Sequence, residues 1–185
     1  EVIPLLEEVS GLTAGSDFFV AFCPERTAEG RALKELRELP QIVGGYDQHS
    51  RELGMRFFNE NTHTVVDVGS LEAAEMCKLL DNTYRDTVFA YANQMAQLTE
   101  KLGLNLSELV TKVNLGYDRN TIPYPSPGVG GPCLSKDPYI LQENFAAFGL
   151  DCAVTTAARK VNESAPRLIY ERCRGLLSSV DKDIH

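Results

Sequence analysis

Residues Tyr124–Pro138 read Tyr-Pro-Ser-Pro-Gly-Val-Gly-Gly-Pro-Cys-Leu-Ser-Lys-Asp-Pro, a stretch in which four prolines and three glycines surround one cysteine. An apolar pattern with helical spacing follows it and stops at Gly149. Asp137 is a favoured N-cap residue and Pro138 suits the first helical position, so the sequence predicts that a helix begins there. Cys133 is therefore expected just upstream of a helix N-terminus, where free N–H groups and partial positive charge favour an anion such as a thiolate.

Cys133 has two interpretations. Cysteines in proteins are most often small buried packing residues. Lys136 and the neighbouring glycines, which let a ligand approach the backbone closely, favour a reactive thiol instead. The other four cysteines lie in apolar strand or helix patterns and are predicted to be packing residues: Cys23, Cys77, Cys152 and Cys173.

The composition is that of an ordinary globular protein, with 185 residues, 43% hydrophobic and 24% charged. A net charge of −8 argues against nucleic acid as a partner, and no apolar run is long enough to span a membrane. Five cysteines without paired spacing favour a reducing, cytoplasmic setting. We predict no metal site, because the three histidines are far apart in the sequence: His49, His63 and His185.

The N-terminal third has the alternating pattern of an α/β unit. A helix is predicted over Val2–Val9 and a buried strand over Phe18–Cys23. Two further strands are expected over Gln41–Gly44 and His63–Val68, and Asp47 caps the helix between them. The inner face of that helix is predicted to carry the following apolar residues: Leu53, Met55, Phe57 and Phe58.

The rest of the chain is predicted to be helical. Ser70 caps a long helix over Leu71–Leu102, about 45–50 Å at 1.5 Å per residue. Asn105 and Glu108 form a capping box for a shorter helix, and the irregular loop Tyr117–Pro132 follows it.

A last helix is predicted from about Cys152 to Val180, which Pro166 should kink or split. Its apolar side is expected to consist of Ala153, Ala157, Val161, Leu168, Cys173 and Leu176. The fold class is therefore mainly α with a small α/β part. The first residue is not a methionine and no closing element is evident at the end, so we expect the chain to be a piece of a longer protein.

Two further groups of polar residues suggest a site. Glu25 and Glu29 follow a predicted strand, where open α/β sheets place ligands, although both are equally compatible with a solvated loop. Lys78 and Asn82 stand four residues apart on the long helix and can both donate hydrogen bonds to an oxyanion. Taken alone, this pair is more typical of a solvated helix face.

Three segments in order resemble the UDP-glucose/GDP-mannose dehydrogenase family. They are Cys-Pro-Glu-Arg-Thr-Ala-Glu-Gly (Cys23–Gly30), Glu-Met-Cys-Lys-Leu-Leu-Asp-Asn (Glu75–Asn82) and Gly-Val-Gly-Gly-Pro-Cys-Leu-Ser-Lys-Asp (Gly128–Asp137). The Pro-Glu-Arg form, Ile-Val-Gly-Gly (Ile42–Gly45) and Asn-Thr-Tyr-Arg-Asp (Asn82–Asp86) are similar to the branch that acts on UDP-N-acetylhexosamines such as UDP-N-acetylmannosamine.

The resemblance implies an organisation in which residues 1–69 are the tail of an NAD-binding Rossmann-type domain. Residues 70–151 would be a helical central domain that carries the cysteine loop and forms a homodimer. Residues 152–185 would be a linker helix towards a C-terminal nucleotide-binding domain. No Gly-x-Gly-x-x-Gly follows a strand in this chain, so the cofactor fingerprint is absent and the isolated chain is expected to be inactive.

The resemblance also implies the chemistry, oxidation of a sugar C6 alcohol to a carboxylate with two NAD per UDP-sugar. Cys133 matches the nucleophile, which forms a thiohemiacetal and then a thioester. Lys78 and Asn82 match oxyanion donors, and Asp137 matches a carboxylate that works with the lysine; such a role competes with N-capping. Glu29 matches a catalytic residue near the cofactor.

The remaining matches concern binding. The cofactor contacts implied are Glu29 and Lys136. The substrate contacts implied are Glu25, Arg26, Arg119, Tyr124, Ser126, Gly128 and Gly130.

The sequence has three alternative interpretations. The first is a non-catalytic helical dimerisation module with an inert Cys133. The second is a UDP-glucose or GDP-mannose 6-dehydrogenase. A cysteine hydrolase or acyltransferase is disfavoured, because no histidine lies in a loop near Cys133 and His63 falls in a predicted strand.

Overall fold

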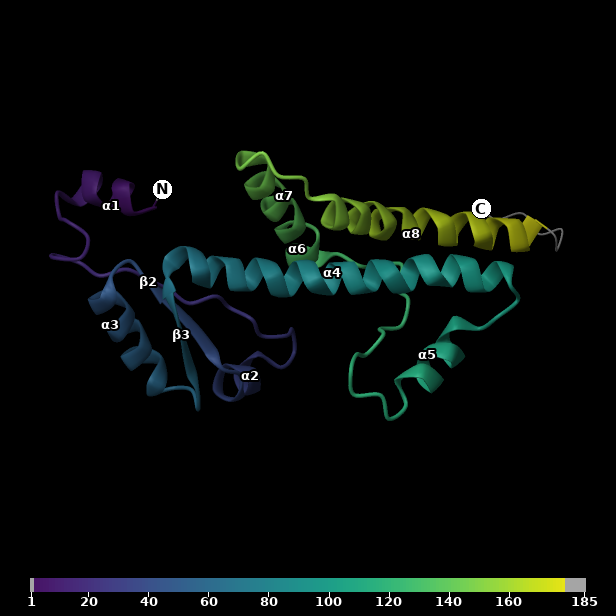
Figure 1. The fold of residues 1–185 in the computed structure, drawn as a ribbon, viewed down its shortest axis with the longest axis horizontal. Coiled ribbons are helices and arrows are strands. Elements are labelled where there is room, and N and C mark those ends of the chain that lie inside the picture. Colours follow the sequence, from purple (N-terminus) through teal and green to yellow (C-terminus); the bar gives the residue numbers. More distant parts are fainter. Residues whose placement is uncertain (1, 179–185) are drawn as a thin grey trace. The chain divides into compact units, whose positions relative to one another are not determined.

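The computed structural model describes residues 2–178. They form two compact units, with the division after Leu80. Helices make up most of the second unit and nearly half of the first, and the strands are confined to the first (Figure 1). The predicted fold class, mainly α with a small α/β part, is therefore confirmed.

The first unit holds a three-stranded sheet in the order β1 (Ala21–Phe22), β2 (Gln41–Gly45) and β3 (Val65–Ser70). β1 is antiparallel to β2, and β2 is parallel to β3. The three predicted strands all exist, but the first is much shorter than expected. Its pairing ends at Phe22 and Pro24 soon follows, a residue that has no N–H to donate to a neighbouring strand.

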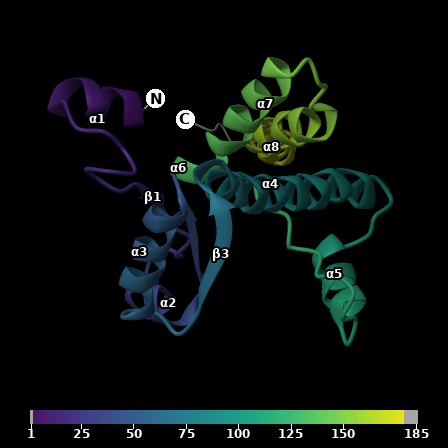
Figure 2. The same cartoon turned by 60° about the vertical axis from the view of Figure 1, so that its left-hand side comes forward.

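Three helices lie wholly in the first unit: α1 (Val2–Ser10), α2 (Ala32–Glu38) and α3 (Gln48–Asn59). α3 lies along the sheet in both ribbon views (Figures 1 and 2). Asp47 caps α3 as predicted, accepting a 2.6 Å hydrogen bond from the N–H of Ser50. The short helix α2 was not predicted.

The predicted inner face of α3 is half wrong, because Leu53 and Phe57 are exposed. The helix approaches the sheet through Gly54, where an added Cβ would lie 2.8 Å from the Cβ of Ala21 and 3.1 Å from Val43. Close backbone approach, which only a glycine permits, therefore sets which side of α3 faces inward.

The space around Gly44 is even smaller than that around Gly54, so a substitution there should destabilise the fold. A Cβ on this residue would lie 2.0 Å from the carbonyl oxygen of Ser70 and 2.9 Å from the Cβ of Ala74. Because the nearest atom is backbone, Gly44→Ala is expected to lower the free energy of unfolding of the first unit by about 3 kcal/mol, measured by thermal or urea unfolding. Gly175→Ala is the control, since nothing lies within 4 Å of that position and alanine suits a helix interior.

The longest helix, α4 (Leu71–Lys101), begins at the predicted residue and runs without interruption through the division between the units. Ser70 caps it, accepting from the N–H of Ala73 at 3.2 Å. The second unit adds α5 (Leu106–Asn114), α6 (Gly131–Leu134), α7 (Asp137–Ala147) and α8 (Ala153–Ser178). Asn105 caps α5 as expected.

α8 continues through Pro166 as one helix, so of the two expected effects, a kink or a split, the split does not occur; its predicted end at Val180 lies outside the described residues. Asp86 of α4 pairs with Arg159, and Glu100 pairs with Arg172 further along both helices. α4 and α8 therefore run side by side in the same direction, as Figure 1 shows.

Candidate functional site

Cys133 lies in the short helix α6 and is half-buried. The next helix, α7, starts at Asp137, with Lys136 as its N-cap residue and no side-chain capping bond. The prediction that Asp137 caps this helix was therefore wrong by one position. Asp137 instead occupies the first helical turn ahead of Pro138, and its carboxylate is engaged elsewhere.

The partner of Asp137 is Asn82 on α4. The Asn82 Nδ2 donates a 2.6 Å hydrogen bond to Oδ2 of Asp137, and both side chains are buried. The Lys136 ammonium lies 3.8 Å from the other carboxylate oxygen and is itself well exposed. The structure thus brings together two predicted site residues that are 55 positions apart in the chain.

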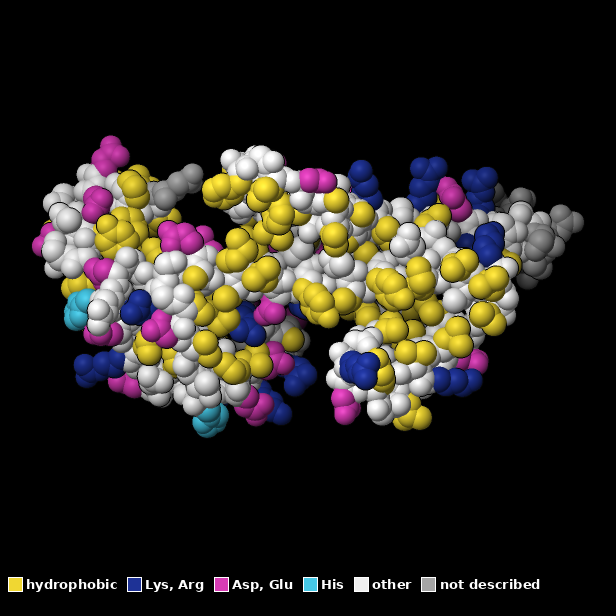
Figure 3. Space-filling model, viewed as in Figure 1, with side chains coloured by type: hydrophobic (Ala, Val, Ile, Leu, Met, Phe, Trp, Pro, Cys, Tyr) yellow, Lys and Arg dark blue, Asp and Glu magenta, His cyan; other side chains and the backbone are white. Residues whose placement is uncertain are grey.

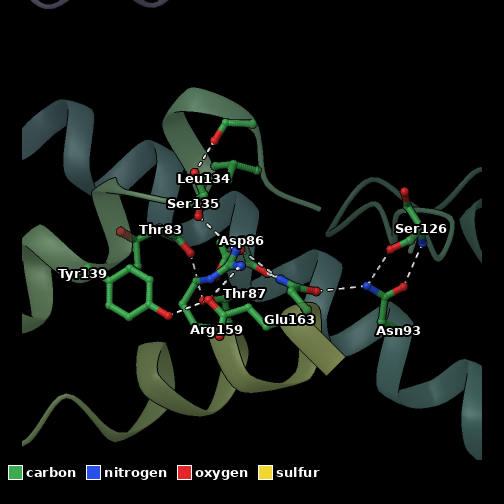
Figure 4. A network of polar contacts seen from close by, with 12 residues as sticks. Thr83, Asp86, Thr87, Asn93, Ser126, Leu134, Ser135, Tyr139, Arg159 and Glu163 are labelled. Carbon is green, nitrogen blue, oxygen red and sulfur yellow. Dashed lines mark hydrogen bonds and ion pairs between the residues drawn. The ribbon is translucent and has the colours of Figure 1, made fainter. Parts of the chain in front are cut away.

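A buried ion pair lies between α4 and α8 (Figure 4). The Arg159 Nη1 donates to Oδ1 of Asp86 at 2.5 Å and to the carbonyl oxygen of Leu134 at 3.0 Å. Asn162 Nδ2 donates to the same carboxylate oxygen at 2.9 Å. Burial raises the pKa of Asp86 above its ordinary value, and the hydrogen bond from Asn162 and the charge of Arg159 oppose that rise only in part.

Asn93 holds the loop that leads to Cys133. Its Nδ2 donates to the carbonyl oxygen of Ser126 at 2.9 Å, and its Oδ1 accepts from the N–H of Ser126 at 2.8 Å. The same Nδ2 also donates to Oδ1 of Asn162 at 2.9 Å. Figure 4 shows the hydrogen bonds of Asn93 beside the Asp86–Arg159 ion pair, and together they form one continuous polar cluster.

The loop has a second anchor nearer its start. Asn114 exchanges hydrogen bonds of 2.8 and 2.9 Å with the backbone carbonyl and N–H of Ile122. Tyr124 Oη lies 2.8 Å from Oγ1 of Thr111. Arg119 is exposed, with its guanidinium carbon 5.8 Å from the ring centroid of Tyr117.

The other predicted site residues in the loop are Gly128 and Gly130. Each has open space where a Cβ would stand, and the N–H of Gly128 lies 3.4 Å from the hydroxyl of Ser126. The backbone here is therefore open to approach, and its contact with a ligand stays a prediction.

Four predicted site residues belong to the first unit: Glu25, Arg26, Glu29 and Lys78. Lys78 Nζ donates to the carbonyl oxygen of Glu25 at 3.1 Å. Hydrogen bonds from Thr27, helped by the charge of Lys78, hold the pKa of the Glu25 carboxyl below its ordinary value. Glu29 and Arg26 are exposed, and the roles of all four around Cys133 stay predictions.

The remaining cysteines divide into two groups. Burial raises the pKa of the Cys23 thiol, and Cys77 and Cys152 are also half-buried, in keeping with packing roles. Cys173 is exposed, so its prediction as a packing residue was wrong. In residues 2–178 no group of three or more histidine, cysteine or acidic side chains is placed to hold a metal ion. None of the helices described there has the length and apolar character of a membrane span.

The polar cluster itself was not predicted. Its four members are Asp86, Asn93, Arg159 and Asn162. A signal for it is present in the sequence, because Asn82, Asp86 and Asn93 recur at helical spacing on a single face of α4. Such a polar face is ordinarily assigned to solvent, and nothing local indicates that α8 covers it.

Residues 72–164 match the family model described as UDP-glucose/GDP-mannose dehydrogenase family, central domain. A UDP-N-acetyl-D-mannosamine dehydrogenase of Methanocaldococcus jannaschii is 34% identical over 173 residues, which are 94% of this chain and 39% of that protein. Its counterpart in Pyrococcus horikoshii is 38% identical over 162 residues, 88% of this chain and 38% of that protein. This chain thus spans about two fifths of the length of these relatives.

Solved structures agree. The UDP-N-acetylmannosamine dehydrogenase structure from Pyrococcus horikoshii is similar with a TM-score of 0.89 at 33% identity, covering 97% of this chain and 42% of that one. An NDP-N-acetyl-D-galactosaminuronic acid dehydrogenase from Methanosarcina mazei gives 0.84 at 34% identity, covering 97% and 40%. The likeness therefore extends over both units of this chain.

Proposed function

The chain belongs to the UDP-glucose/GDP-mannose dehydrogenase family, and from that premise we propose that it is part of an NAD-dependent nucleotide-sugar 6-dehydrogenase. Such an enzyme oxidises the C6 alcohol of the sugar to a carboxylate in two hydride transfers. The observation that carries the proposal is the buried Asn82–Asp137 hydrogen bond. It joins α4 to the first turn of α7, the helix that follows Cys133. It supports the proposal because Asp137, the partner of the Asn82 amide, follows Cys133 of the glycine-rich loop by four positions.

We propose that Cys133 attacks the aldehyde formed in the first oxidation. The thiolate forms a C–S bond, the second hydride leaves the resulting thiohemiacetal carbon, and water cleaves the thioester to the carboxylate and the free thiol. The amide nitrogen of Asn82 has two hydrogens, and it donates one of them in the hydrogen bond to Asp137. The second is free to donate to an oxyanion, a role in which Lys78, one helical turn earlier, would assist.

When bound, NAD would accept the hydride in each of the two oxidations. Of this chain's residues, Lys136 and Glu29 are proposed to contact it. They fit that role because both are exposed, and the Lys136 side chain, with 67% of its surface accessible, retains contact with solvent beside its carboxylate neighbour. An accessible ammonium suits the phosphate groups of a dinucleotide.

The substrate is proposed to be a UDP-N-acetylhexosamine. This rests on the names of the relatives, which include UDP-N-acetyl-D-mannosamine and NDP-N-acetyl-D-galactosaminuronic acid dehydrogenases. Residues proposed to contact it are Glu25, Arg26, Arg119, Tyr124, Ser126, Gly128 and Gly130.

A homodimer is proposed to form through the helices of the second unit. Figure 3 shows hydrophobic side chains exposed over this unit. On α4 the residues Tyr84, Tyr91 and Leu98 recur every seven positions, and each is more than half exposed. A stripe of this kind is typical of a helix that packs against a partner, and sedimentation equilibrium tests the assembly state. A cytoplasmic location is proposed on the same family membership.

The test of the function is NAD reduction by the enzyme that carries this chain, with UDP-N-acetylmannosamine, UDP-N-acetylgalactosamine, UDP-glucose and GDP-mannose as substrates. We expect two NADH per sugar and the highest kcat/KM with a UDP-N-acetylhexosamine. The chain alone is expected to form no NADH. Failure of all four sugars would refute the function, whereas a preference for UDP-glucose or GDP-mannose would correct only the substrate.

A further inference from the structure

The loop at Ser126 and the helix of Cys133 are joined by an unbroken series of side-chain hydrogen bonds. Every bond in it lies between 2.5 and 3.0 Å. In order, the series runs through Ser126, Asn93, Asn162, Asp86, Arg159 and Leu134.

The middle of the series is removed from water. The exposed fractions are 0% for Asp86, 1% for Asn162, 3% for Arg159 and 6% for Asn93. A buried polar side chain that loses its partner cannot recover the bond from solvent, so each member is held by the next. Figure 4 shows the side chains converging between α4 and α8.

Stability alone does not explain this cluster. A buried ion pair is often no more stabilising than apolar residues of similar volume, and the surrounding interface is otherwise built from small residues such as Ala90, Ala158 and Ala165. Asp86 Oδ2 and Arg159 Nε are buried without a hydrogen-bond partner among the described residues, a further cost. What the cluster does provide is a fixed direction for two backbone groups at its ends.

At each end of the series a side chain hydrogen bonds to a backbone group. Such a bond constrains the path of the chain more than a contact between two side chains does. Pro125 and Pro127 lack an N–H, so Asn93 uses the one backbone donor that this part of the loop offers, at Ser126. At the other end, Arg159 holds the carbonyl of Leu134, the residue directly after Cys133.

We propose that Asp86, Arg159, Asn162 and Asn93 are positioning residues that set the substrate loop and the Cys133 helix relative to each other. This rests on the proposed function, since it assigns the loop to the substrate and the thiol to the chemistry. Asn162 is the informative member, because in residues 2–178 it hydrogen bonds to neither the loop nor α6.

Asn114 supplies a matched control. It clasps the backbone of Ile122 in the same loop with two bonds, as Asn93 clasps Ser126, but it has no link to α8 or α6 in the described hydrogen bonds. In the enzyme that carries this chain, Asn162→Ala is compared with Asn114→Ala by hydrogen exchange of the Ser126 amide. The rate of iodoacetamide modification of Cys133 is followed in parallel by peptide mass spectrometry.

Asn162→Ala is expected to speed exchange at Ser126 at least tenfold and to change the modification rate of Cys133 at least threefold. Asn114→Ala is expected to alter neither by more than twofold. A change at only one end, at neither, or equally in both variants overturns the proposal. If circular dichroism shows that Asn162→Ala does not fold, Asn93→Ser replaces it with the same criterion at Cys133, because serine cannot span both Ser126 and Asn162.

The values of kcat and KM distinguish a loss of positioning around Cys133 from a general loosening of the loop. Asn162→Ala is expected to lower kcat at least tenfold, whereas Asn114→Ala, which only loosens the loop, raises KM and leaves kcat within twofold. Equal kcat values for the two variants contradict the proposal. Should Cys133→Ser retain full activity, the proposed function fails, and the exchange and modification results still decide whether the two ends are coupled.

Discussion

Cys133→Ser is expected to abolish formation of the sugar carboxylate by the enzyme that carries this chain, with a loss of at least about a thousandfold in rate. A serine hydroxyl is a far weaker nucleophile than a thiolate near neutral pH, and no histidine of the described second unit is present to activate it. The first hydride transfer does not use the thiol, so the variant should still carry out that step and form NADH from it. Product analysis by mass spectrometry and NADH absorbance measure the two effects.

Cys152→Ser is the matched control. Cys152 is half-buried in the same unit, directly before α8, and the comparison therefore replaces one sulfur atom of similar exposure in each variant. It is expected to keep more than half of the activity. Carboxylate formation by Cys133→Ser at a rate close to that of the parent enzyme would make Cys133 a packing residue and favour a non-catalytic dimerisation module.

The helix starts could be predicted from the sequence because their cause is local. Asp47 accepts from the N–H three residues later, Ser70 does the same for Ala73, and Asn105 does so for Glu108. Each bond is decided within one helical turn, so the pattern of residues there is sufficient. Asp137 is the instructive exception, since its carboxylate bonds to Asn82, 55 residues away, in place of a cap.

The buried face of α8 could not be predicted, because its cause is distant. The apolar pattern pointed to Ala153 and Ala157, which are exposed. The face that packs on α4 carries Arg159 and Asn162, and polar residues are assigned to solvent unless a partner is known. That partner, Asp86, lies 73 residues earlier in the chain than Arg159.

The candidate site also combines features that could be predicted from the sequence with features that could not. Cys133, Asp137 and Asn82 were identified by resemblance to family motifs, and the structure adds the bond between the last two. Composition and periodicity alone could suggest a reactive thiol but no mechanism. The positioning cluster was missed because its meaning exists only once α4 and α8 are packed together.

Arg159→Met is expected to lower the free energy of unfolding of the second unit by about 3–5 kcal/mol, the cost of leaving a buried charge without its partner. Asp86 is fully buried, and the variant removes its ion pair and the bond to the Leu134 carbonyl together. Urea unfolding followed by circular dichroism measures the loss. Arg167→Met, two turns further along α8, removes an exposed pair with Glu171 and is expected to leave the unfolding midpoint unchanged.

The pH dependence of the same variant separates a lost charge partner from lost packing. Arg159 lowers the pKa of Asp86 in the native protein, so its removal should raise that pKa further above the unfolded value of about 3.9. A carboxyl with a raised pKa binds protons more tightly in the folded state. The variant should therefore be closest to the parent in stability below about pH 4 and lose stability as the pH rises. Adding Asp86→Leu should remove this pH dependence and recover much of the stability at pH 7; if the deficit of Arg159→Met is the same at all pH values, packing and not the unpaired carboxylate is its cause.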